Sequence, residues 1–114
     1  MPDTHLTHEQ YVHRVLEAYQ RTPGTCGHVR PHDRQLALEL HQRDIPLRTV
    51  ENALMLAVAR RTFRPNQTRP LATVRSLRYF VPVIEELLAE PVGADYFEYV
   101  RRQLEPLYSC YSHT

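Results

Sequence analysis

Apolar residues recur at helical spacing along most of the chain, and turns rich in proline or glycine separate the stretches. The first predicted helix starts after Thr7, because Thr7 and Gln10 have the spacing of a capping box. Pro23 and Gly24 form a strong turn signal that ends it. The apolar stripe of this helix consists of Val12, Val15, Leu16 and Tyr19.

Two further helices are expected between Asp33 and Arg64. Asp33 is the expected cap of the second helix, and the run RDIP ends it. Pro46 then falls near the first turn of a third helix, where its missing N–H costs little. This helix is apolar on all sides around ALMLAVA at 53–59, so we expect it to be central in the fold.

The fourth predicted helix carries the longest apolar stripe, from Leu71 to Leu88, and it contains Pro82. A proline inside a helix clashes with the carbonyl four residues back, so a kink or split is expected near residues 78–82. A break at 90–95 precedes a fifth helix that Asp95 can cap. Nothing alternates at period two for long enough to predict a sheet. The pattern therefore predicts an all-α single domain over residues 1–114, a compact bundle of about five helices.

The predicted fourth helix also has a second apolar stripe. It consists of Phe80, Val83 and Leu87. Two interpretations stay open from the sequence: a homodimer interface, or a surface that the fifth helix covers.

Positive charge is concentrated in the middle of the chain, although the net charge is only +1. Residues 1–51 hold six arginines and seven acidic residues, and residues 85–114 hold two arginines and six acidic residues. Residues 52–84 hold six arginines and no acidic residue. Every basic residue is arginine, which a GC-rich genome would also produce, so the count alone does not indicate a function.

The positions of the six arginines in residues 52–84, the central arginines, do suggest a function. They lie at the end of the third helix, in the following loop and at the start of the next helix, where Arg75 and Arg78 are expected to share a face. Guanidinium groups bind phosphate with two hydrogen bonds, and nearby aromatic rings can stack on bases. The predicted nucleic-acid-binding residues are Arg60, Arg61, Arg64, Arg69, Arg75, Arg78 and Tyr79. Internal ion pairs with the acidic 85–105 segment, or contact with an acidic protein, would explain the same charge.

Catalytic and cofactor signals are weak in this sequence. No nucleophile motif is present, and three glycines do not make a phosphate-binding loop. Glu85 and Glu86 are adjacent and would diverge on a helix. Cys26, His28 and His32 form one cluster with metal-ligand spacing, but no partner pair is evident. We therefore expect a non-enzymatic protein without a cofactor or metal.

The sequence also indicates a cellular compartment. No apolar run follows the first methionine or reaches the length of a membrane span. Cys26 and Cys110 are too few for a disulfide framework, and they are interpreted as free thiols. A cytoplasmic protein that does not contact a membrane is the expectation.

Residues 33–89 resemble the C-terminal helical domain of the DnaD-like primosome proteins. The resemblance rests on RDIPLRTVENALMLAVARR, an Arg/Pro loop and TVRSLRYFVPVIEELL. The family's Tyr-x3-Ile-x3-Trp spacing falls on Tyr79, Val83 and Leu87, of which two differ in type, and Pro82 interrupts it. The resemblance implies binding of single-stranded DNA and contact with a replicative helicase or its loader.

Together these observations predict a small non-enzymatic nucleic-acid-binding protein of a bacterial replication system or mobile element, which contacts phosphates through the arginine-rich region. Single-stranded DNA is the favoured ligand, and RNA stays open. The alternative from a different class is a protein–protein interaction or regulatory subunit. Its basic 60–78 face or its acidic 85–105 segment would then dock a partner protein.

Overall fold

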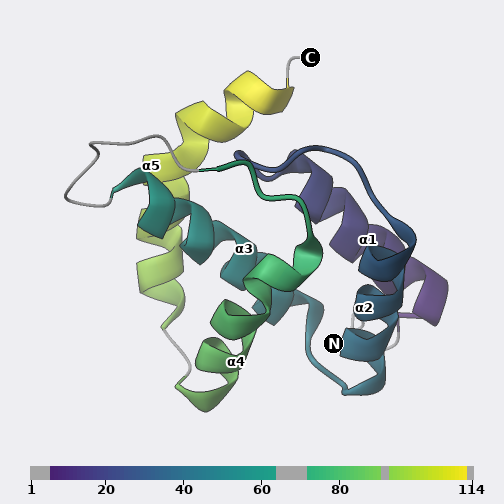
Figure 1. The fold of residues 1–114 in the computed structure, drawn as a ribbon. Coiled ribbons are helices and arrows are strands. Elements are labelled where there is room, and N and C mark those ends of the chain that lie inside the picture. Colours follow the sequence, from purple (N-terminus) through teal and green to yellow (C-terminus); the bar gives the residue numbers. More distant parts are fainter. Residues whose placement is uncertain (1–5, 64–71, 91–92, 113–114) are drawn as a thin grey trace.

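Five α-helices and one 3₁₀ turn make up the described structure, a computed structural model that covers residues 6–63, 72–90 and 93–112 (Figure 1). Within these ranges there is no β-strand, only one isolated bridge. The predicted all-α bundle is therefore confirmed. In chain order the elements are α1 (His8–Arg21), α2 (Pro31–Gln42), α3 (Leu47–Thr62), the 3₁₀ helix η2 (Leu77–Phe80), α4 (Val81–Ala89) and α5 (Ala94–Ser112).

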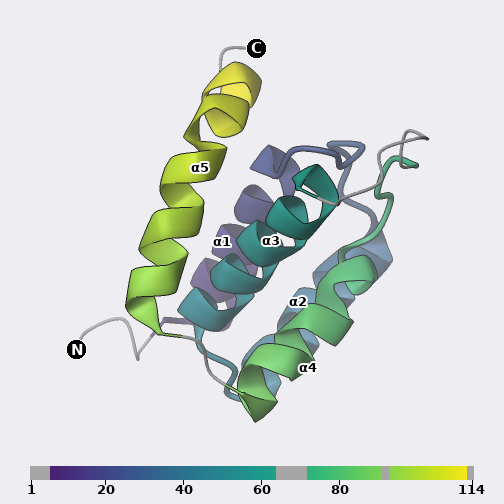
Figure 2. The ribbon, with the colours of Figure 1, turned by 90° about the vertical axis from the view of Figure 1, so that its left-hand side faces the viewer.

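Helix α3 is the centre of the bundle, as its apolar sequence predicts. It contacts α1, α4, α5 and η2, and Figure 2 shows it with α5 on one side and α4 on the other. Every residue from 53 to 59 is buried, so all sides of these two turns contact other elements. Removing this apolar surface from water is the main favourable contribution to folding.

Local hydrogen bonds explain where α1 begins and where α2 ends. The Thr7 hydroxyl accepts from the Gln10 N–H at 3.1 Å, and the Gln10 side chain accepts from the Thr7 N–H at 3.0 Å, which confirms the capping box. At the end of α2, Asp44 has a φ of 60°. This left-handed residue lets the Ile45 N–H return to the Leu40 carbonyl at 3.2 Å and closes the helix.

The predicted start of α2 is wrong by three residues. The helix begins at Pro31, and Arg30 rather than Asp33 is the capping residue. Pro31 suits the first position because the N–H that it lacks would have no partner inside the helix. Asp33 is the third helical residue, and its carboxyl group accepts from the Arg30 N–H at 3.0 Å.

The predicted fourth helix is split at the expected place but is shorter than expected. Residues 72–76 are not helical; Val74 pairs with Thr25 in a parallel bridge, through bonds of 2.8 and 2.9 Å to Gly24 and Cys26. Helical structure begins with η2 and continues as α4, with Pro82 in the first turn of α4. Proline is tolerated there, so it starts a helix instead of kinking one. Leu71 lies outside the described residues.

The second apolar stripe is not available for a dimer interface. Phe80 and Leu87 are buried within the chain, and Val83 packs partly buried against the same core. The Phe80 ring meets the Tyr19 ring of α1 edge to face, with centroids 6.1 Å apart. Helix α3, not the fifth helix, makes the extensive contact with α4.

Helix α5 extends beyond the apolar pattern that predicted it. It continues through Pro106 to Ser112, although the sequence from Tyr108 onwards shows no clear apolar pattern. Proline removes one backbone hydrogen bond and crowds the preceding turn. Figure 1 shows that α5 changes direction along its length, as expected for an internal proline.

The Asp33 side chain joins two segments that are more than forty residues apart in the sequence. It is fully buried at 0% exposure, and its Oδ1 accepts from the Leu77 N–H at 2.9 Å and the Ser76 hydroxyl at 3.4 Å. Its other oxygen, Oδ2, accepts from Arg30. One carboxyl group therefore positions both the start of α2 and the start of η2.

We predict that Asp33→Ala lowers the free energy of unfolding by about 3 kcal/mol, because it leaves two backbone N–H groups without an acceptor. Asp33→Asn should cost less, since its amide oxygen can still accept. Urea unfolding followed by circular dichroism measures both values. The matched control is Glu39→Ala on the exposed side of α2; an equal loss in this control would contradict the assignment.

Candidate nucleic-acid interface

The Arg61 side chain is held by contacts within the chain. Its guanidinium donates to the Ala72 carbonyl at 2.8 Å and to the Tyr79 hydroxyl at 3.2 Å. The guanidinium carbon also lies 5.6 Å from the centroid of the Tyr79 ring, within range of a cation–π interaction. Arg61 thus ties the end of α3 to the segment before α4.

Arg61 also contacts the turn after α1. A Cβ added at Gly24 would lie 3.6 Å from the Arg61 Nε, which is ordinary contact. The φ of 91° at Gly24, a value that residues with a Cβ rarely adopt, is what requires glycine there. The Gly24 carbonyl accepts from Val74 in the bridge, so one small region connects α1, α3 and the start of η2.

Arg60 is paired with an acidic residue. Its guanidinium makes two hydrogen bonds to Glu86, at 2.7 and 3.0 Å, and these bonds lower the pKa of the Glu86 carboxyl group. The neighbouring Glu85 makes a similar pair with Arg43, at 2.8 and 3.2 Å, and its pKa is lowered in the same way. The two glutamates diverge, as expected, and connect α4 to the ends of α2 and α3.

These exposed pairs affect stability only modestly. A carboxyl group with a lowered pKa stabilises the fold at neutral pH, and that contribution is lost as the pH falls through the folded-state pKa. The pairing of Arg60 with Glu86 means that part of the predicted site carries internal ion pairs, which was one of the alternative explanations for the central charge.

Arg75 and Arg78 differ from Arg60 and Arg61, because their side chains have no partner among the described residues. Both are exposed, and neither forms an ion pair with any described acidic residue. The expectation that they share a helical face is wrong, because Arg75 lies in the non-helical segment and Arg78 in η2. Arg64 and Arg69 lie outside the described residues.

The structure adds two arginines that the sequence interpretation did not include. Arg30 and Arg34 flank Asp33 at the start of α2, and Asp33 binds Ser76 and Leu77, which lie between Arg75 and Arg78. All four residues are exposed. We call Arg30, Arg34, Arg75 and Arg78 the arginine surface. Arg30 and Arg34 do not stand out in the sequence, because residues 1–51 have almost no net charge as a whole. The signal that the sequence does offer is the position of both arginines at the start of one predicted helix.

The arginine surface has no exposed negative charge of its own. In residues 28–34 and 72–80 the only acidic residue is Asp33, which is fully buried. His28 and His32 are exposed on the same segment, and the His32 Nε2 lies 3.6 Å from the Asp33 Oδ1. Four positive charges without exposed counter-charges create a local positive potential that attracts anions.

Two aromatic rings in the arginine-rich part of the sequence are exposed. Tyr79 follows Arg78 and is 47% exposed, and Phe63 at the end of α3 is 53% exposed. The Tyr79 ring contacts the Arg61 guanidinium and, edge to face, the Phe80 ring, whose centroid is 5.2 Å away. A ring fixed in this way and open to solvent can stack on a nucleobase.

The cluster of Cys26, His28 and His32 does not form a site. The Cys26 thiol contacts the His28 carbonyl oxygen at 3.8 Å. Across the described ranges, no group of three or more His, Cys, Asp or Glu side chains is placed to hold a metal ion.

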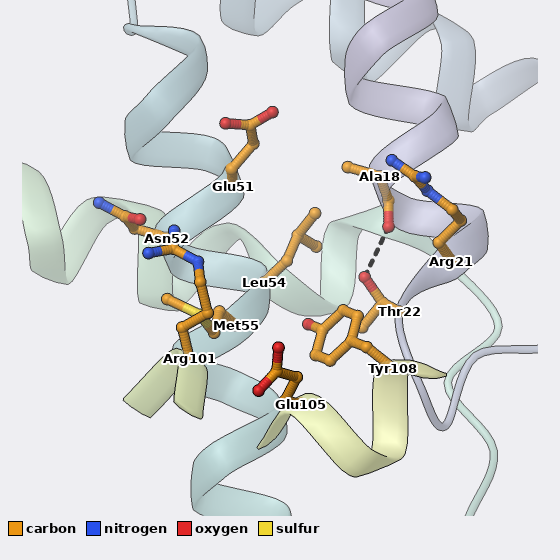
Figure 3. Close-up of a pocket in the computed structure, with 10 residues that line it drawn as sticks. All are labelled: Ala18, Arg21, Thr22, Glu51, Asn52, Leu54, Met55, Arg101, Glu105 and Tyr108. Carbon is orange, nitrogen blue, oxygen red and sulfur yellow. Dashed lines mark hydrogen bonds between the residues drawn. The ribbon is translucent and has the colours of Figure 1, made fainter. Parts of the chain in front are cut away.

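A separate hollow of about 450 Å³ lies between α1, α3 and α5 (Figure 3). Its floor includes Leu54 and Met55, and Glu51 and Glu105 lie on opposite sides of it. Burial raises the pKa of the Tyr108 phenol, while a hydrogen bond with Thr22 opposes the rise. Arg21 and Arg101 balance the two glutamates, so the hollow does not favour a ligand of either charge.

Comparison of the chain with protein-family models, curated protein sequences and solved structures finds no match. The resemblance of residues 33–89 to the DnaD-like proteins therefore stays a prediction. None of the helices in the described ranges is both long enough and apolar enough to cross a membrane.

We predict that Arg61→Gln destabilises the fold by about 1–3 kcal/mol, because the Ala72 carbonyl, the Tyr79 hydroxyl and the Tyr79 ring all lose their partner. Arg75→Gln and Arg78→Gln should each change stability by less than about 0.5 kcal/mol. Chemical unfolding of the three variants measures the difference. Equal losses in all three would show that Arg61 has no special structural role.

Proposed function

We propose that the protein binds nucleic acid through the arginine surface, without catalysing a reaction. The observation that carries this proposal is that buried Asp33 joins two segments, residues 30–34 and 75–78, which together hold four exposed arginines and no exposed acidic residue. Guanidinium groups bind phosphate oxygens through pairs of hydrogen bonds, and a repeating phosphate backbone can occupy several of them together.

The division of the central arginines supports this proposal. Arg60 and Arg61 already have partners inside the chain, so their charge has a structural explanation. Arg75 and Arg78 have no described ion-pair partner, and Arg30 and Arg34 extend the same charge across α2. Exposed arginines gathered away from acids are expected to repel each other, which an anionic ligand would relieve.

A single-stranded ligand suits the surface better than a duplex. Tyr79 and Phe63 offer exposed rings for stacking, and unpaired bases present the faces that such rings contact. The resemblance to DnaD-like proteins suggests the same ligand, and with it a bacterial replication or mobile-element setting and a helicase or loader as a protein partner.

A protein-binding function is the second candidate, favoured by exposed apolar groups elsewhere. Tyr96 and Tyr99 on α5 are 46% and 60% exposed, and Leu88 on α4 is 39% exposed. These residues belong to the acidic part of the chain. Under this alternative the partner would contact α4 and α5, and substitutions in the arginine surface would leave its binding unchanged.

We predict that labelled single-stranded DNA binds at about 50 mM salt and binds about 50-fold more weakly at 200 mM. Four phosphate contacts to a single strand give this loss by counterion release. Fluorescence anisotropy with single-stranded DNA, duplex DNA and RNA measures the affinity and ranks the three ligands. The Arg75→Gln/Arg78→Gln double variant should reduce the slope of log affinity against log salt by about 1.4.

The matched control for this experiment is Arg14→Gln/Arg48→Gln. It makes the same change in net charge at two arginines that line a different hollow, around His41 and Asp44. Absence of binding at the lower salt, or an equal loss in both double variants, would reject the arginine surface as the binding site.

A further inference from the structure

Two histidines from different helices meet ring to ring at the surface. His8 is the first residue of α1, and His41 lies in the last turn of α2. Their Nδ1 atoms are 2.6 Å apart, with ring centroids separated by 4.5 Å and planes nearly perpendicular at 88°. The contact joins the beginning of one helix to the end of the next.

The His41 ring is held in position by a buried neighbour. The Tyr11 ring lies against it with centroids 4.6 Å apart. Tyr11 is only 3% exposed, and its hydroxyl donates to the Ile45 carbonyl at 2.7 Å. Packing and this hydrogen bond fix the tyrosine, so the His41 ring has a rigid support on one side while His8 faces solvent.

Two neutral histidines satisfy this contact only with different tautomers. One ring must carry its proton on Nδ1 and donate, while the other must present an Nδ1 lone pair. A metal ion accepts the lone pairs of both rings and removes this requirement. Two imidazole nitrogens at about 2.05 Å from a tetrahedral ion are about 3.3 Å apart, so a small rotation of the rings would make room for it.

We propose that His8 and His41 form a two-histidine binding site for a late first-row divalent cation such as Ni²⁺ or Zn²⁺. No third protein ligand is available among the described residues, so water completes the coordination. Imidazole pairs favour these ions over Mg²⁺, which prefers oxygen ligands. The bound ion would fasten the start of α1 to the end of α2, at the opposite end of α2 from Asp33.

The charged groups around the site allow such an ion to bind. Arg14, Asp44, Arg48 and Glu51 line the hollow of about 720 Å³ that His41 also borders. Two acidic and two basic side chains leave this hollow without net charge. The proposal is independent of nucleic-acid binding, because no residue of the arginine surface lines this hollow.

The test is thermal unfolding of the tag-free full chain, first treated with a chelator. Added Ni²⁺ or Zn²⁺ should bind the folded pair more tightly than the unfolded chain and should raise Tm by about 5 °C at roughly tenfold excess over the dissociation constant. Mg²⁺ at the same concentration should leave Tm unchanged, and a chelator should reverse the shift. Calorimetric titration should show one ion per chain.

Substitutions test whether His8 and His41 cause the rise in Tm. His8→Gln and His41→Gln should each abolish the Tm shift. His13 is an exposed histidine on α1, the helix that also carries His8, and His13→Gln should retain the shift. A Cys26→Ser/His28→Gln/His32→Gln variant should also retain it. No shift in the unmodified chain at millimolar metal, a shift that survives in His8→Gln or His41→Gln, or its loss in the cysteine variant would each overturn the proposal.

Discussion

The hydrogen bonding of the buried Asp33 carboxyl group is the interaction on which the rest of the described structure depends. A buried polar group is tolerated only when its hydrogen bonds are satisfied, and Asp33 meets this condition through Arg30, Ser76 and Leu77. The start of α2 and the start of η2 are therefore held together. Residues 72–76, which have no helix of their own, are then placed alongside the turn after α1 by the Val74 bridge.

This arrangement separates positive from negative charge within a nearly neutral chain. The carboxyl group that organises the junction is buried, while the arginines beside it are exposed. Elsewhere, Glu85 and Glu86 of α4 pair with Arg43 at the end of α2 and Arg60 at the end of α3. The same fold thus compensates charge where α4 meets the ends of α2 and α3, and leaves it uncompensated near Asp33. The proposed ligand is the anion that this exposed charge would attract.

The helices were predictable where local signals decide structure, and less so where distant contacts decide it. The capping box at Thr7 and the apolar run at 53–59 identified α1 and α3 correctly, because both depend on neighbours in sequence. Residues 72–76 follow a helical apolar pattern, yet Val74 pairs with Thr25 and Asp33 binds Leu77, so tertiary hydrogen bonds override the local preference. Charge alone predicts Arg60 and Arg61 as binding residues, but their partners come from α4 and from residues 72 and 79, which the sequence around them does not indicate.

The most direct test of the account is a titration of the ¹⁵N-labelled full chain with a single-stranded oligonucleotide of about ten nucleotides at low salt, followed by amide chemical shifts. The account predicts that the largest changes fall in two separate segments, residues 28–34 and 74–80, and that they grow together with one affinity. Changes concentrated around the hollow between α1, α3 and α5, or in only one of the two segments, would contradict it.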